Sequence, residues 1–222
     1  MTSRCRFCEA PLSLSLVDLG QAPLANSYLA SAKDIPKERR FPLHVMVCER
    51  CWLVQTTETV PADEIFDQDY AYLSSYSASW VAHAKSYATS MRERFDLNGE
   101  SLVVEIASND GYLLQHFVAA GIPVLGVEPA GHAAELAEDK GIPSCVAFFT
   151  ESYAKTLKGE GLSADLLAAN NVLAHVPDIR DFMAGFKVLL KPKGVATFEF
   201  PHLAKLIQHV QFDTIYHEHY SY

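Results

Sequence analysis

Apolar and polar residues follow two different patterns along the chain, and the change falls near residue 100. From residue 101 onward, short apolar runs alternate with stretches of helical periodicity, most of which end at glycine. The apolar runs are SLVVEIA, PVLGVEP, PSCVAFF, ADLLAANNVL and GVATFEF. Such runs are typical of parallel strands covered by helices on both faces. Because right-handed crossovers join parallel strands, the pattern predicts a doubly wound, Rossmann-like α/β domain.

The N-terminal part of the chain has short alternating apolar segments, which Gly20, Pro23 and Pro42 interrupt. This pattern predicts a small module of strands and loops that is too thin to bury a core by itself. From Asp63 to Phe95 the periodicity becomes helical, and one face carries apolar side chains, namely Trp80, Ala84, Tyr87, Ala88 and Met91. We therefore expect four parts, with bounds at residues 1–58, 59–95, 96–202 and 203–222.

Four cysteines form two Cys-x-x-Cys pairs, Cys5 with Cys8 and Cys48 with Cys51. A gap of two residues lets both thiolates of a pair face one ion, and two pairs complete the tetrahedral shell of zinc. Four protein ligands leave no open coordination position, so we expect a structural zinc site. The alternatives are two disulfides or four unrelated thiols, which the doubled spacing makes less favourable.

The net charge and the lengths of the apolar runs argue against two classes of function, nucleic-acid binding and membrane insertion. The chain has 222 residues, with 18 Lys and Arg against 27 Asp and Glu, which gives a net charge of -9. This charge argues against a nucleic-acid partner bound through a basic surface. No apolar run reaches the roughly 18 residues of a membrane span, and MTSRCRFCEAP does not look like a secretory signal. We expect a cytoplasmic protein with no membrane partner.

Polar residues follow three of the predicted strands at their carboxyl ends, where α/β sheets bind ligands. The first loop, Glu105 to Gly111, lacks the glycines of GxGxxG, which favours a ligand without phosphates. Glu128 ends the second strand, where a carboxylate can hold a ribose diol. Asn170 and Asn171 end the fourth strand, and His175 follows them.

Each of these residues also has a simpler interpretation. Asp110 fits the N-cap of the first helix, Glu128 fits a solvated strand end, and Asn170 and Asn171 fit a turn. Three polar groups at carboxyl ends of one sheet favour a binding site over three separate coincidences.

The combined motifs resemble the bacterial sugar C-methyltransferases, which are class I S-adenosylmethionine-dependent enzymes. The resemblance spans the chain and rests on the paired cysteines, DYAYLSSYS, VEIASNDGYLL, NNVLAHVPD and FDTIYHEHYSY. It implies C-methylation next to the ketone of a nucleotide-linked deoxysugar, such as C-3 of a TDP-4-keto sugar. S-adenosylmethionine and structural Zn²⁺ would be the cofactors, and a nucleotide-sugar would be the partner.

The resemblance also implies roles for individual residues. The loop beside the methionine part of the cofactor would contain Glu105, Asn109, Asp110 and Gly111. Glu128 would hold the ribose, Phe148 and Phe149 would flank the adenine, and Asn170 and Asn171 would close the pocket. Zinc would be bound by Cys5, Cys8, Cys48 and Cys51. The sugar would be faced by Tyr72, His175, Tyr216, Glu218 and His219.

The chemistry of a ketosugar needs a base and groups that bind oxygen. A C–H next to a ketone is acidic because its anion delocalises into an enolate. We expect His219 to be the base, with His175 as the other candidate, and Tyr72 or Tyr216 to bind the oxygens. The HEH run has two other interpretations: on a strand, His217 and His219 would share a face as metal ligands do, or the run is an inert polar surface.

The chain departs from the family pattern at its end, because it stops at Tyr222, three residues after His219. Family members continue with further strands and a second α/β domain. Without those strands, ATFEFP would be an unpaired edge. We therefore expect a fragment that is inactive alone. Two other functions remain open: a non-catalytic module that binds cofactor and zinc, and a methyltransferase for a non-sugar acceptor. The sequence predicts no oligomeric state.

Overall fold

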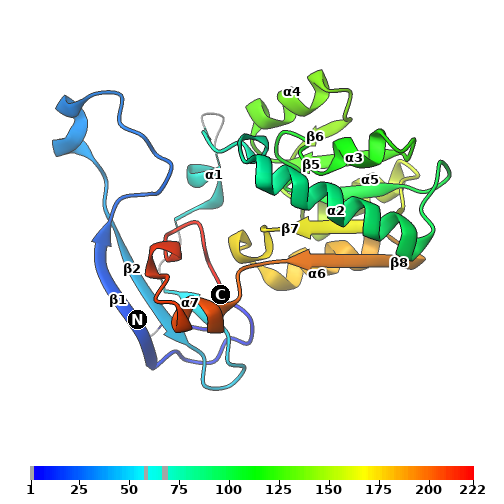
Figure 1. Cartoon of the computed structure of the whole chain (residues 1–222). Helices are drawn as coiled ribbons and strands as arrows, with labels where there is room; N and C mark the ends of the chain where they lie inside the picture. Colours follow the sequence, from blue (N-terminus) through cyan, green and yellow to red (C-terminus); the bar gives the residue numbers. More distant parts are fainter. Residues whose placement is uncertain (1–2, 58–59, 67–69) are drawn as a thin grey trace. The chain divides into compact units, whose positions relative to one another are not determined.

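A computed structural model describes residues 3–57, 60–66 and 70–222. The chain forms two compact units (Figure 1). The first unit combines three segments, Met1–Phe66, Asn171–Arg180 and Phe200–Tyr222. The second unit combines Asp67–Asn170 with Asp181–Glu199. Residues at the two ends of the chain thus belong to one unit.

The second unit contains a five-stranded sheet in the order β6-β5-β4-β7-β8, with every neighbouring pair parallel. The strands are β4 (Val103–Ile106), β5 (Val124–Glu128), β6 (Ser144–Val146), β7 (Ala164–Asn170) and β8 (Leu190–Glu199). The predicted α/β class and its five parallel strands are confirmed. The strand order reverses beside β4, and this reversal is where doubly wound sheets bind ligands.

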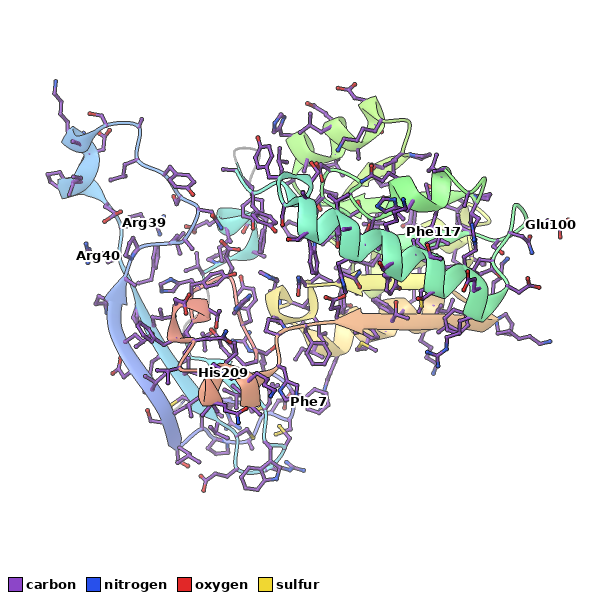
Figure 2. The ribbon with its side chains drawn as sticks, viewed as in Figure 1. Phe7, Arg39, Arg40, Glu100, Phe117 and His209 are labelled. Atoms are coloured by element: carbon purple, nitrogen blue, oxygen red, sulfur yellow. The ribbon has the colours of Figure 1, made fainter. Side chains whose placement is uncertain are left out.

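Helices follow the strands of this sheet. They are α3 (Leu114–Val118), α4 (Gly131–Asp139), α5 (Glu151–Gly159) and α6 (Ile179–Leu189). A longer helix, α2 (Ala78–Phe95), precedes the first strand and crosses the unit in Figure 1. Its predicted apolar face is confirmed, because Ala84 and Ala88 are buried and Trp80, Tyr87 and Met91 pack on the core. That core includes Phe117 of α3, which Figure 2 labels.

The region from Asp63 to Phe95, predicted to have helical periodicity, is only partly helical among its described residues. The structure has a short helix α1 (Ala62–Ile65), a 3-10 turn η2 (Ser74–Tyr76) and then α2. Ser77 is extended, and its hydroxyl accepts a hydrogen bond from the Trp80 N–H at 3.3 Å. This N-cap sets the start of α2, so the preceding segment remains outside the helix.

The first unit is built on an antiparallel sheet of β1 (Leu14–Ala22), β2 (Phe41–Val47) and β3 (Val54–Thr56), in that order. A 3-10 helix, η1 (Ala32–Lys37), lies between β1 and β2. The sheet buries few large side chains, and a separate small cluster surrounds the cysteines, with Leu12 and Met46. The predicted thin module of strands and loops is confirmed.

The C-terminal segment packs on this sheet. It contains α7 (Leu203–Gln208) and η4 (Phe212–Thr214), and then runs beside β3. The Thr56 N–H donates to the Tyr220 carbonyl at 3.2 Å, and the Tyr222 N–H donates to the Val54 carbonyl at 2.9 Å. Figure 1 shows this segment in red alongside the blue strands. Tyr220 is buried against Val60 and Ile65.

No helix in the described part of the chain combines the length and the apolar character needed to cross a membrane.

Candidate functional site

The loop after β4 turns through left-handed backbone, with positive φ at Ala107, Asn109 and Gly111. At Gly111, where φ is 76°, an added Cβ would lie 2.3 Å from Cδ1 of Ile142, so only glycine fits. Asp110 is not a helix N-cap, because α3 has Leu113 in that position. Instead, Oδ2 of Asp110 lies 3.0 Å from Nζ of Lys140 and accepts the Ser75 hydroxyl.

Glu128 is buried, so the interpretation as a solvated strand end is wrong. Its Oε2 accepts the Asn109 N–H and its Oε1 accepts the Ala130 N–H, each at 2.8 Å. Burial raises the pKa of Glu128 to about 7, although these two backbone donors oppose the rise. Each carboxylate oxygen keeps a further lone pair, which is what two adjacent hydroxyl donors need.

Glu105 is completely buried at the centre of the sheet. Neither of its carboxyl oxygens has a hydrogen-bond partner at ordinary distance among the described residues. Burial raises its pKa well above the usual range, the charges of Glu128 and Asp110 raise it further, and the nearby Tyr112 hydroxyl opposes them. This environment favours the protonated form, which can donate a hydrogen bond.

Asn109 fixes the segment that precedes α2. Its Oδ1 accepts the Ser74 N–H at 2.8 Å, and its Nδ2 donates to the Tyr72 carbonyl at 3.1 Å. The Tyr72 side chain is about half exposed. The loop after β4 therefore positions the segment that carries Tyr72, within the same unit.

A cavity of about 540 Å³ lies between that segment and the beginning of α4, the helix that follows Glu128. It is lined by Tyr70, Ala71, Leu73, Tyr76, Gly131, His132 and Glu135. The lining combines two tyrosines with the polar side chains of His132 and Glu135.

The other residues predicted to contact the cofactor lie in different environments. Phe149 is buried and packs edge-on against Phe182 and Phe186, whereas Phe148 is exposed. Asn170 is buried, and its Oδ1 has no partner among the described residues. Asn171 is exposed and has a φ of 53°. Of the two asparagines, Asn170 therefore has the polar atom that a ligand would satisfy.

The four paired cysteines meet, as predicted. One Sγ atom from each lies within 4.8 Å of all the others. Cys5 and Cys51 are 3.6 Å apart, and Cys8 and Cys48 are 3.5 Å apart. These distances are too long for disulfides and close to the roughly 3.8 Å between thiolates around tetrahedral zinc. Nε2 of Gln55 donates to the Cys5 sulfur at 3.2 Å. The four thiols fit structural zinc.

A second cluster, His175 with Tyr216, Glu218 and His219, lies in the first unit. The rings of His175 and His219 are 4.7 Å apart, and the Tyr216 ring lies 4.3 Å from that of His219. Oε2 of Glu218 is 4.0 Å from Nδ1 of His175. We refer to these four residues as the histidine cluster.

The hydrogen bond of His219 fixes its tautomer. Nδ1 lies 2.9 Å from the Thr214 carbonyl, which can only accept, so Nδ1 carries the proton. Nε2 is then the basic nitrogen of the neutral ring. Burial lowers the pKa of His219, although the Thr214 carbonyl opposes this effect. Burial, and then the charge of His219, lowers the pKa of His175 to about 3. Both rings are neutral at pH 7.

His217 does not join this cluster. Its Nε2 faces the Phe41 and Pro42 carbonyls, each at 3.2 Å. Residues 216–219 form a turn and not a strand. Among the described residues, the cysteines are the one group with metal-ligand geometry. The interpretation of HEH as a metal site is therefore wrong.

One contact of the histidine cluster had no counterpart in the sequence predictions. Nδ2 of Asn26 donates to Oε1 of Glu218 at 2.7 Å, across 192 residues. The sequence around Asn26 contains residues that favour turns, but it gives no indication of a contact with Glu218.

Comparisons with known proteins agree with both units. A family model described as a zinc binding domain matches residues 5–66. C-methyltransferase NovU from Streptomyces niveus is 37% identical over 218 residues, which are 98% of this chain and 52% of that protein. The chain thus spans about half the length of this curated relative.

Two solved structures resemble part of this chain. A SAM-dependent methyltransferase from Archaeoglobus fulgidus has 17% identity and a TM-score of 0.49, with 61% of each chain covered. DesVI from Streptomyces venezuelae has 17% identity and a TM-score of 0.46, with 65% of this chain and 59% of that one covered.

A second family model, described as a methyltransferase domain, matches residues 80–222, which is more than half of the chain. These residues contain the whole parallel sheet and the HEH run. The chain belongs to the methyltransferase domain family.

Proposed function

We propose that this chain is part of an S-adenosylmethionine-dependent C-methyltransferase that acts on the carbon next to the ketone of a nucleotide-linked deoxysugar. The observation that carries the proposal is the buried histidine cluster, in which the basic nitrogen of His219 is defined by its bond to Thr214. The name of the relative from Streptomyces niveus, a C-methyltransferase, supports the same reaction class.

The second unit has groups that fit the cofactor. The carboxylate of Glu128 suits the ribose hydroxyls, because it is buried and keeps free lone pairs beside two backbone donors. Asn170 offers an unsatisfied amide oxygen, and Glu105 offers a buried carboxyl group. When bound, S-adenosylmethionine supplies a methyl group that is activated by its sulfonium charge.

The first unit has groups that fit the proton transfer. The neutral His219 ring can take a proton from the carbon next to a ketone through Nε2. The electron pair that the proton leaves behind moves into the enolate. The resulting imidazolium lies in a cluster with Glu218, whose carboxylate is buried and faces His175. A buried negative charge close to a developing positive charge stabilises it.

Tyr72 and Tyr216 are proposed to bind the keto and hydroxyl oxygens of the sugar. The Tyr216 ring contacts the His219 ring at a tilt of 35°, and the backbone of Tyr72 is held by Asn109. A TDP-4-keto-6-deoxysugar is the substrate class that we propose, and the nucleotide-sugar is the partner.

The proposal is tested by incubating the complete protein of which this chain is part with S-adenosylmethionine and a TDP-4-keto-6-deoxysugar, and measuring the sugar product by mass spectrometry. We expect a methylated sugar from the unaltered protein and a loss of about a hundredfold or more in kcat for His219→Asn. His209→Asn is the matched control, because His209 is exposed after α7 and is labelled in Figure 2. Full activity in His219→Asn would exclude His219 as the base.

A further inference from the structure

Asn26 lies in the loop between β1 and η1, with a φ of 58°. Asparagine is one of the few non-glycine residues that adopt this left-handed backbone at low cost. Two residues earlier, Leu24 packs on the cluster of Val60, Ile65 and Tyr220. Leu24 thus anchors the loop that carries Asn26, and Tyr220 of the same hydrophobic cluster anchors the segment that carries Glu218.

The Asn26 side chain forms a hydrogen bond with a buried carboxylate, that of Glu218. Glu218 is only 2% exposed, and its Oε1 accepts from the Asn26 amide at 2.7 Å. The other oxygen of Glu218 faces Nδ1 of His175 at 4.0 Å, and the His175 ring contacts that of His219. One carboxylate oxygen is thus held by the N-terminal loop, while the other faces the imidazoles.

The hydrogen-bond donor to Glu218 is an uncharged amide. An amide supplies a hydrogen bond without a positive charge, whereas Lys or Arg in its place would neutralise the carboxylate. The Asn26 amide therefore does not neutralise a negative charge on Glu218. An amide also cannot accept a proton near neutral pH, so it does not compete with His219 as a base.

We propose that Asn26 is a positioning residue that holds the Glu218 carboxylate in the orientation that serves the histidine cluster. This inference rests on the proposed function, in which His219 is the base. It adds a residue from the N-terminal loop to the catalytic machinery, 192 residues away from Glu218 in sequence.

The substitution Asn26→Gly tests the role of the Asn26 side chain separately from that of its backbone. Asn26→Gly keeps the left-handed backbone and removes only the donor. We expect kcat to fall about ten- to a hundredfold, because small misplacements of catalytic groups have effects of this size. KM for the sugar should remain nearly unchanged. Asn98→Gly is the matched control, since Asn98 is an exposed turn residue before β4.

Asn26→Asp gives a pH signature that a structural role would not give. The new carboxylate has the same shape but repels Glu218 when it is ionised. When it is protonated, its O–H restores the donor, so the activity relative to the unaltered protein should rise as the pH falls. Among the described residues, Tyr220 interacts electrostatically with Glu218, and the Tyr222 ring contacts His219. Tyrosines do not ionise in the acid range, and this also holds for Tyr216 within the cluster.

A readout besides activity keeps this inference separate from the proposed function. NMR signals of the His175 and His219 rings should shift in Asn26→Gly and move back toward their original positions in acid for Asn26→Asp. If the unaltered protein methylates no ketosugar but these ring signals shift, the positioning role stands and the proposed function fails. Unchanged kcat in Asn26→Gly together with unchanged ring signals would overturn the positioning role.

Discussion

At the scale of single residues, the environment of a side chain decides its chemistry more than its type does. Glu105 and Glu128 are both buried carboxyl groups with raised pKa values, yet only Glu128 accepts two backbone donors. The sequence could place both residues near the carboxyl ends of predicted strands, because the strand pattern is local. It could not predict the bond between Asn26 and Glu218, because no periodic pattern links residues so far apart.

The raised pKa of Glu128 predicts a pH dependence of stability. The unfolded group releases its proton near pH 4.5, whereas the folded group keeps it to about pH 7. The folded state therefore binds more protons within this window, and the free energy of unfolding falls as the pH rises through it. A shift of this size corresponds to about 3 kcal/mol.

Urea unfolding of the unaltered protein and of Glu128→Gln between pH 4.5 and 7 measures this effect. We expect a shallower slope in the variant, because Gln does not titrate. Glu105 contributes a slope of the same sign in both proteins. Because the charge of Glu128 raises the Glu105 pKa, the difference between the slopes contains the titration of Glu128 and its effect on Glu105. Identical slopes would show that the pKa of Glu128 is the same in the folded and unfolded states.

Gly111 gives a second prediction at this scale. Gly111→Ala should destabilise the protein by about 3 kcal/mol or more, because the backbone is left-handed and the new Cβ meets Ile142. Gly159→Ala, at the end of α5, is the control, since nothing lies within 4 Å of its Cβ position. Thermal unfolding compares the two, and equal melting temperatures would contradict the steric account.

At the scale of elements, β3 links the cysteines to the C-terminal segment. Gln55 of β3 donates to Cys5 and forms a bridge with Ser221. Arg6, next to Cys5, donates to the Thr56 carbonyl at 2.9 Å and lies 5.2 Å from the Tyr220 ring centroid. The position of the HEH run therefore depends on the order of the zinc module.

This link predicts the effect of zinc removal. Chelation, or Cys48→Ser, should increase amide hydrogen exchange in residues 215–222 about as much as in β3. The parallel sheet forms a separate unit with its own core, so S-adenosylhomocysteine binding should persist. Hydrogen exchange with calorimetry measures both effects. Unchanged exchange in residues 215–222 of the zinc-free protein would show that the zinc module does not support this segment.

Strands were easier to predict than the start of α2. The apolar runs of β4, β5 and β7 are buried on both faces almost throughout, so their pattern is strong. The Ser77 cap that begins α2 depends on one side chain. Phe148 and Phe149 show a similar limit. They are adjacent and chemically alike, but only Phe149 is buried, because its contacts come from α6.

At the scale of the whole molecule, the two compact units carry different parts of the proposed reaction. Groups that fit the cofactor lie in the unit of the parallel sheet, and the histidine cluster lies in the unit that contains the cysteines. The unit with the cysteines also takes in residues 171–180 and 200–222. The predicted bounds at residues 58, 95 and 202 follow the sequence pattern and remain a prediction.

The proposed reaction requires His219 to remove a proton from the carbon next to a ketone. Deuterium exchange into a TDP-4-keto-6-deoxysugar tests it directly, with S-adenosylhomocysteine in place of the methyl donor. We expect deuterium at this carbon, detected by NMR, with the unaltered protein and with His209→Asn. With His219→Asn, exchange should fall about a hundredfold or more. Equal exchange with His219→Asn and the unaltered protein would contradict the account.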